Sequence, residues 1–272
     1  MTIDLHISAK TYQIDTEQPI DISIPLNFHG QQPNAYGVPH ATAKTYEDGN
    51  FIGDTRKGGS CNFEEYKLVP HCNGTHTECV GHLALERISI HAVLQNSLYP
   101  ATLISVEPVE ALGSGDSCRH GKDKEDKLIT RTGLTKAMVD RSNAFLEALI
   151  VRTLPNDDSK MSRQYLQEPP PYFSVEAMQL ITELGVKHLL VDTPSVDRPF
   201  DEGKMTTHHI YWDLPQESHE VDPKNHSMNT ITEMIYVPNE VADGQYFLNL
   251  QIPGFVADAA PSRPVIYKLR KA

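Results

Sequence analysis

The sequence has no excess of basic residues: 36 Asp and Glu outnumber 24 Lys and Arg, and the formal net charge is −12. Proteins that bind nucleic acid present a basic surface to the phosphates, so this composition argues against that class of partner. The densest cluster of charge, residues 120–127, mixes both signs and predicts a solvated loop.

Long apolar runs are absent as well, and no stretch approaches the roughly 18 residues that cross a bilayer. The N-terminus lacks the basic start and apolar stretch of a secretory signal. There are four cysteines, Cys61, Cys72, Cys79 and Cys118. Without an export signal we expect reduced thiols, available for packing or for a metal, in a soluble cytoplasmic protein with no membrane partner.

Length and composition predict one domain over residues 1–272, because 39% hydrophobic side chains supply one sizeable core. No internal repeat or linker divides it. Residues 27–60 are rich in Gly, Pro, Asn and Asp without periodicity, and they predict a long loop. Alternating or apolar runs predict two short strands that meet near Pro19, and further strands at residues 63–69, 101–106, 148–153, 230–238, 245–254 and 264–271.

The clearest helix signal begins at Ser174, a good helix cap, and ends at Gly185. Its apolar residues repeat at helical spacing, and residues 187–192, KHLLVD, predict a short buried strand after it. A strand, this helix and this second strand predict a parallel crossover, so the class is mixed α/β.

Residues 71–82, HCNGTHTECVGH, place three histidines, two cysteines and a glutamate side by side. Imidazole, thiolate and carboxylate are the usual ligands of zinc or a similar divalent ion. Three interpretations are open: a polar loop, a closed structural zinc site and an open catalytic site. No second Cys or His pair follows, which favours the open site over the closed one. If the segment is extended, alternate side chains share a face, and four donors lie on one side: Cys72, His76, Glu78 and His82.

The same segment resembles the signature His-x-Gly-Thr-His-x-Asp-x-Pro-x-His of the cyclase family of metal-dependent hydrolases, which includes kynurenine formamidase and isatin hydrolase. The likeness continues along nearly the whole chain, in DISIPL, LIVRT, DTPSVD, THHIYW, ITEMIYVP and DAAPSRPVI. The resemblance implies a single-domain α/β fold with a β-barrel-like core of mixed sheet and flanking helices, rather than a doubly wound sheet. It also implies a homodimer or higher homo-oligomer.

The resemblance further implies a metal site with one or two divalent ions, zinc or manganese. A first ion would be bound by His76 and Glu78, together with Cys72 at the position of the first histidine of the signature. A second ion would share Glu78 and would also be bound by His208 and Glu233. The implied ligands are Cys72, His76, Glu78, His208 and Glu233, and the implied catalytic acid/base is His82.

Three positions of the signature differ in this chain. Cys72 stands where the family has histidine, Glu78 where it has aspartate, and Val80 where it has proline. A thiolate ligand would favour zinc over manganese. His71 is the alternative to Cys72 as the first ligand, and His209 is the alternative to His208.

The implied activity is hydrolysis of an amide, formamide, cyclic amide or lactone bond in a small molecule, as in an arylformamidase acting on C–N bonds other than peptide bonds. Two alternatives are a metal-dependent cyclase or dehydratase of a small acid, and a non-enzymatic metal-binding protein. Kynurenine formamidases carry a Trp-Pro-Gly-Asp-like segment early in the chain, whereas the only tryptophan here is Trp212. The substrate is therefore unassigned. We expect the long loop to roof the pocket, with Tyr36, Tyr46 or Phe51 lining it.

Overall fold

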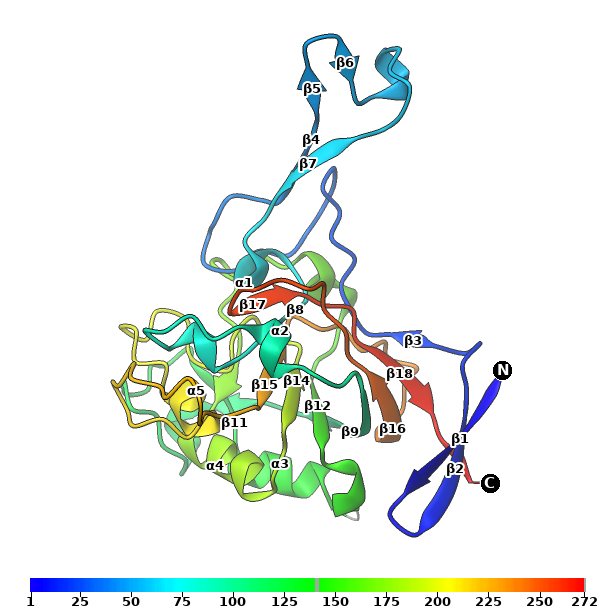
Figure 1. The fold of residues 1–272 in the computed structure, drawn as a ribbon. Helices are drawn as coiled ribbons and strands as arrows, with labels where there is room; N and C mark the ends of the chain where they lie inside the picture. The colour runs from blue at the N-terminus through cyan, green and yellow to red at the C-terminus, as the bar shows by residue number, and fades with distance from the viewer. Residues whose placement is uncertain (140–141, 272) are drawn as a thin grey trace.

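The computed structural model describes residues 1–139 and 142–271, and a curled sheet of nine strands forms its centre (Figure 1). The strand order is β17-β8-β15-β14-β12-β9-β16-β18-β3. This half-barrel of mixed sheet with few helices is the architecture that the resemblance implies. Its strands are β3 (Ile20–Asp21), β8 (His76–Glu78), β9 (Leu98–Val106), β12 (Ala148–Thr153), β14 (His188–Val191), β15 (Thr230–Glu233), β16 (Gly244–Asn249), β17 (Ala259–Pro261) and β18 (Val265–Lys268).

Four parallel strands, β9, β12, β14 and β15, form the middle of the sheet. Every residue of β12 and β14 is buried, which explains why these strands appear in the sequence as continuous apolar runs. β8 continues the sheet antiparallel to β15 and is itself paired with β17. The pairing brings three segments that are far apart in the sequence side by side at one edge of the sheet.

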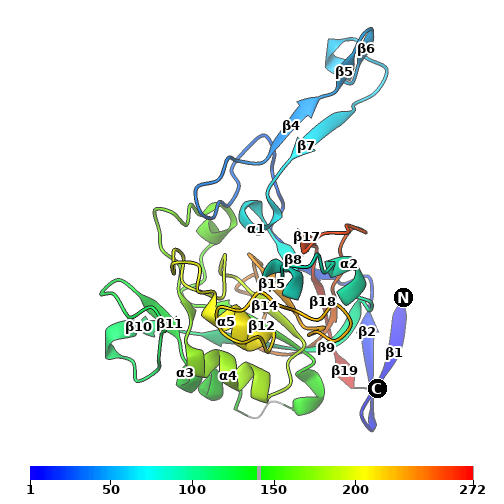
Figure 2. The same cartoon turned by 60° about the vertical axis from the view of Figure 1, so that its left-hand side comes forward.

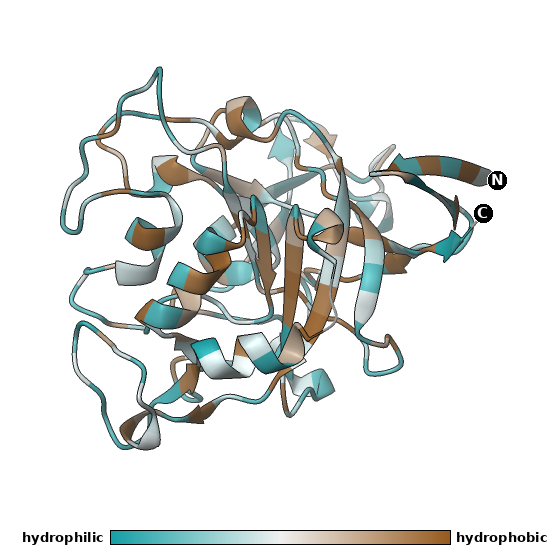
Figure 3. Ribbon diagram, turned by 90° about the horizontal axis from the view of Figure 1, so that it is seen from below, coloured by the Kyte–Doolittle hydropathy of each residue, from teal (hydrophilic) through white to brown (hydrophobic). Residues whose placement is uncertain are grey.

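The predicted helix is α4 (Val175–Glu183), and Ser174 caps it by accepting a hydrogen bond from the backbone N–H of Ala177 at 3.0 Å. The parallel pairing of β12 with β14 confirms the predicted crossover. Apolar residues concentrate on the central strands and on parts of the helices (Figure 3). Among the described residues, no helix has both the length and the apolar character to span a membrane. The other helices are α1 (Pro70–Asn73), α2 (Ile90–Val93), α3 (Arg131–Ala137) and α5 (Thr206–Tyr211).

Two small sheets lie beside the central one. The first pairs β10 (Val109–Glu110), β11 (Lys127–Ile129) and β13 (Tyr172–Phe173). The second joins both ends of the chain, because β2 (Lys10–Asp15) pairs with β1 (Thr2–Ile7) and with β19 (Arg270–Lys271) (Figure 1).

The prediction of a structureless loop over residues 27–60 is wrong in part. This segment contributes a strand of a two-stranded arm, β4 (Thr42–Thr45) with β7 (Glu64–Lys67), which carries a second hairpin of β5 (Glu47–Asp48) and β6 (Phe51–Ile52). Figures 1 and 2 both show this arm projecting from the body of the molecule. β7 lies within the strand predicted at residues 63–69, and that prediction is confirmed. β4 is polar and mostly exposed, so no apolar alternation marks it in the sequence.

Candidate metal centre

The strand pairing positions the first three donor residues. His76 and Glu78 are alternate residues of β8 and therefore share a face of the sheet. Glu233 lies opposite His76 on the neighbouring strand β15. The expectation of one extended segment from residue 71 to 82 is wrong outside β8, because Pro70 begins a helical turn and residues 80–82 form a 3₁₀ turn.

His208, on α5, completes the inner group. Its Nε2 lies 3.1 Å from Oε1 of Glu78 and 3.8 Å from Oε1 of Glu233. Its Nδ1 lies 2.6 Å from Oδ2 of Asp197, whose carboxylate also accepts the backbone N–H of Thr207 at 2.8 Å. The carboxylate of Asp197 can only accept, so it fixes a proton on Nδ1 and orients Nε2 toward the carboxylate of Glu78.

His76 is held in the same way. Its Nδ1 is 3.0 Å from the carbonyl oxygen of Gly74, which can only accept a hydrogen bond. The lone pair of Nε2 then points toward Oε2 of Glu233, 3.4 Å away. Nε2 of His76 and Oε2 of Glu78 are buried and have no hydrogen-bond partner among the described residues. Buried acceptors that face one another in this way need a shared proton or a cation.

Three groups of donor atoms, each within 4.8 Å of one another, lie next to each other here. The innermost is His76, Glu78 and Glu233, and the second is Glu78, His82 and His208. The third, nearer the surface, contains His71, His82 and Asp258. The structure therefore brings together four of the five predicted ligands and the predicted acid/base.

Cys72 lines the cavity into which these donor groups open, but its sulfur belongs to none of the three groups. Burial, with Glu233 nearby, raises the pKa of its thiol to about 11. His71, the alternative to Cys72, extends into the donor cluster, and its Nε2 lies 3.5 Å from Oε2 of Glu78. His209, the alternative to His208, is buried beside His219 with ring centroids 6.2 Å apart and joins none of the groups.

The charges of the centre are tightly coupled. Burial alone would raise the pKa of Glu78, but the neighbouring His82 and His208 outweigh it and lower this pKa. Burial alone would lower the pKa of His208, but Asp197 and Glu78 raise it well above its ordinary value. Glu78 is therefore an anion at neutral pH, and positive charge is favoured around it.

Asp258 is a site residue that was not predicted. It comes directly before β17, and its Oδ2 lies 3.1 Å from Nε2 of His71 and 3.3 Å from Nδ1 of His82. These two imidazoles lower its pKa. The sequence offered one signal, since Asp258 opens the DAAPSRPVI segment that carries the resemblance.

The donors open into a cavity of about 450 Å³. Tyr36 and Phe200 lie on its wall with their rings edge to face, 5.7 Å between centroids, and Met205 is nearby. Of the three residues predicted to line the pocket, only Tyr36 does so. Tyr46 and Phe51 pack together with Phe63 on the projecting arm instead.

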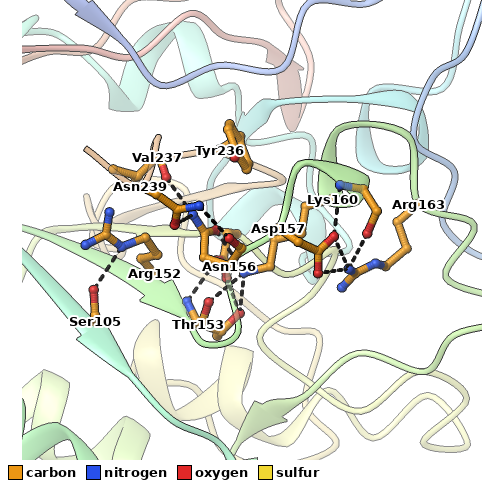
Figure 4. A network of polar contacts seen from close by, with 12 residues as sticks. Ser105, Arg152, Thr153, Asn156, Asp157, Lys160, Arg163, Tyr236, Val237 and Asn239 are labelled. Atoms are coloured by element: carbon orange, nitrogen blue, oxygen red, sulfur yellow. Dashed lines mark hydrogen bonds and ion pairs between the residues drawn. The ribbon is translucent and has the colours of Figure 1, made fainter. Parts of the chain in front are cut away.

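A buried polar network supports the strand ends beside the centre (Figure 4). The ammonium of Lys160 donates to the carbonyl of Thr153 at 2.6 Å and to Oδ2 of Asp192 at 2.8 Å. Nδ2 of Asn156 donates to the carbonyl of Val237 at 2.9 Å. Lys160 also contacts Oγ1 of Thr153 at 3.0 Å and Oδ1 of Asn156 at 3.1 Å, so its three N–H groups all have acceptors. The network ties the ends of β12 and β14 to the segment after β15.

The Cyclase family model, whose description is "Putative cyclase", matches residues 20–198 of this chain. A kynurenine formamidase of Bacillus thuringiensis (strain Al Hakam) is 23% identical over 258 residues, which cover 92% of this chain and 98% of the relative.

Two solved structures are similar to this fold. The structure of a "predicted metal-dependent hydrolase" from Bacillus stearothermophilus has a TM-score of 0.58 at 15% identity, and the match covers 92% of this chain and 98% of that one. An isatin hydrolase bound to the product analogue thioisatinate has a TM-score of 0.61 at 12% identity, covering 94% of this chain and 93% of that one. At these identities the likeness is one of fold.

Proposed function

The chain belongs to the cyclase family, and from that premise we propose that it is a metal-dependent hydrolase. Its reaction would be cleavage of an amide, formamide or cyclic amide bond, or of a lactone, in a small molecule. The observation that carries the proposal is the convergence of buried imidazole nitrogens and carboxylate oxygens beside a half-buried histidine at one cavity.

The donor set fits a divalent cation. His76 and His208 each have Nδ1 occupied and Nε2 directed at a carboxylate, the arrangement in which histidines ligate metals. Glu78 and Glu233 add the negative charge that a cation would balance, and Glu78 belongs to both inner groups. We propose these four residues as ligands, with Cys72 still a predicted fifth, and zinc as the ion with manganese as the alternative.

A divalent cation held there supplies Lewis acidity, which polarises a carbonyl and makes water more acidic. The chain supplies the proton transfers. His82 faces the cavity with 27% of its side chain exposed, and its Nε2 is 3.9 Å from Oε2 of Glu78. In hydrolysis a water molecule loses a proton as its oxygen bonds to the carbonyl carbon, and the leaving nitrogen gains one as the C–N bond breaks. We assign both transfers to Nε2 of His82.

The cavity favours a small, partly aromatic substrate. Tyr36 and Phe200 give it an apolar wall against which an aromatic ring can pack. The guanidinium of Arg198, which also lines the cavity, is paired with Asp123 and Asp126. Its Nε and Nη2 are occupied and its charge is balanced by these two carboxylates, which supports an uncharged aryl amide or lactam.

A substrate panel with metal control tests this function. Purified protein would be assayed on N-formyl arylamines, isatin-like lactams and aryl lactones after chelation and after readdition of zinc or manganese. We expect hydrolysis of at least one aryl amide or lactam that chelation abolishes and one ion restores. Hydrolysis that persists after complete metal removal, or no turnover of any compound by metal-loaded protein, would overturn the proposal.

A further inference from the structure

The carboxylate of Asp258 contacts the ring of His82, the proposed acid/base residue. Its Oδ2 accepts a hydrogen bond from Nδ1 of His82 at 3.3 Å. The ring of His71 stacks on that of His82, with centroids 4.5 Å apart and planes inclined by 24°. Nε2 of His71 is 3.1 Å from the same oxygen, an ion-pair distance, but makes no hydrogen bond to the part of the chain that the structure describes. One side chain thus holds the edge of the His82 ring and another covers its face.

The backbone is built to bring Asp258 to this place. The N–H of Cys79 donates to the carbonyl of Asp258 at 3.1 Å, and the N–H of Ile90 donates to the carbonyl of Ala257 at 2.8 Å. Gly81 packs against the segment that carries Asp258. A Cβ on Gly81 would come within 2.0 Å of the carbonyl oxygen of Ile88 and 3.4 Å of the Cβ of Asp258. Only glycine leaves room for this close approach.

We propose that Asp258 is a positioning residue for His82, an inference that rests on the proposed function. A carboxylate can only accept, so Asp258 fixes an N–H at Nδ1 and orients Nε2 toward the cavity. When Nε2 takes a proton from water, the same carboxylate lies beside the imidazolium and balances its charge. Stacking by His71 restricts rotation of the ring during both steps.

The same three side chains are also a set of donors for a cation. The hydrogen bond between Asp258 and His82 is formed, however, and it occupies Nδ1, the ring nitrogen of His82 that faces Asp258. Asp258 and His82 are also half-exposed, whereas the inner ligands are excluded from water. The geometry therefore favours positioning over an outer metal site, and metal analysis of the variant below distinguishes the two.

The first test is the protonation state of His82, which does not depend on turnover. Long-range ¹H–¹⁵N NMR of zinc-loaded protein, with the signal assigned by comparison with His82→Gln, reports which ring nitrogen carries the proton. We expect the Nδ1–H form in the wild type and a shift toward the Nε2–H form in Asp258→Asn. A wild-type ring that carries its proton on Nε2 would overturn the inference, even if Asp258→Asn does not fold.

The second test is kinetic. We expect Asp258→Asn to lower kcat about 10- to 100-fold with little change in KM and an unchanged metal content. Asp21→Asn is the matched control, because Asp21 has the same side-chain exposure of 39% and pairs with the distant Arg263; it should keep wild-type kcat. Wild-type kcat in Asp258→Asn, or the loss of one bound ion from it, would refute positioning. Inactive wild-type protein would instead refute the proposed function and leave the NMR test decisive.

Discussion

His82 differs from the other histidines of the centre in its access to water. The side chains of His76 and His208 are 0% and 1% exposed, whereas that of His82 is 27% exposed. A ligand gains from exclusion of water, since the ion then has no competing partner. An acid/base group must instead meet both water and the leaving group, which favours the partly open position.

Replacing His82 by alanine should therefore separate binding from turnover. We expect His82→Ala to retain its metal and to lose at least about 100-fold in kcat, the contribution typical of a positioned acid/base group. Elemental analysis and steady-state kinetics on the same preparation measure the two quantities. Undiminished turnover would withdraw the assignment of His82.

A second set of variants distinguishes Cys72 from His71 as the ligand at the position of the first signature histidine. Cys72 remains a predicted ligand, and its thiol pKa of about 11 means that an ion must displace the thiol proton when it binds. We expect Cys72→Ser to weaken zinc binding at least about tenfold in chelator competition, because a hydroxyl is a poor ligand for zinc. Cys79→Ser is the control, since Cys79 is buried and its sulfur contacts the carbonyl of Ile88.

Cys79→Ser should keep wild-type zinc affinity. If Cys72→Ser also keeps it while His71→Gln loses it, the role of first ligand belongs to His71.

Most residues of the centre could be predicted from the sequence, but for unequal reasons. His76, Glu78 and His82 lie in one short segment rich in donor atoms, and that alone suggested a metal. His208 came only from the family resemblance, because nothing local distinguishes a ligand from a core histidine. Glu233 came from the resemblance and from one local signal, since a lone carboxylate in an apolar strand needs a partner or a metal. Asp258 was missed since its partner lies 176 positions away, and a contact of that kind exists only after β17 pairs with β8.

Secondary elements were predictable where burial leaves a pattern. The cap at Ser174 and the apolar run of β12 mark elements that pack on the core, and both were found. The arm strand β4 has no buried face and was missed, whereas its partner β7 lies within the strand predicted at residues 63–69. The one-sided extended face expected for residues 71–82 failed for a local reason, the helical turn that begins at Pro70.

The cap of α4 contributes to stability through two hydrogen bonds. Oγ of Ser174 accepts from the N–H of Ala177 at 3.0 Å and donates to Oδ2 of Asp116 at 2.6 Å, in a fully buried position. We expect Ser174→Ala to lower the free energy of unfolding by about 1–2 kcal/mol, measured by urea denaturation. Thr182→Ala near the other end of α4 should cost less than about 0.5 kcal/mol, and equal losses in the two variants would contradict the capping role.

β14 contains a buried histidine that makes stability depend on pH. Burial, with Lys187 adjacent, lowers the pKa of His188 to about 4, and its Nδ1 lies 2.9 Å from Oγ1 of Thr230. The unfolded chain binds a proton at its ordinary pKa near 6.5, whereas the folded chain does not until about pH 4. Stability from this residue is therefore complete above pH 6.5 and is lost as the pH falls through this window.

We expect His188 alone to reduce the free energy of unfolding by on the order of 2 kcal/mol between pH 7 and pH 5. Urea denaturation at several pH values measures this slope in the wild type and in His188→Gln. The variant should show a shallower pH dependence over the same range. Equal slopes would mean that His188 is protonated in the fold.

At the scale of the whole molecule, the centre lies where the sheet edge meets α5. β8 and β15 supply His76, Glu78 and Glu233, and α5 supplies His208 from a different part of the chain. These elements meet only in the complete fold, so the unfolded chain cannot hold an ion with the same set of donors. An ion bound to the folded protein alone must therefore stabilise the entire molecule by mass action.

Removing the ion should consequently lower global stability as well as activity. With zinc at 100 times its dissociation constant, the stabilisation is about 2.7 kcal/mol, and chelation should remove it. Urea denaturation with and without chelator measures the difference, and it should grow with zinc concentration. His76→Ala removes one of the inner ligands. This variant should lose its bound metal and show no difference in stability with and without chelator. A zinc-dependent gain in this variant equal to that of the wild type would place the ion elsewhere in the molecule, because a site that lacks an inner ligand cannot bind it with unchanged affinity.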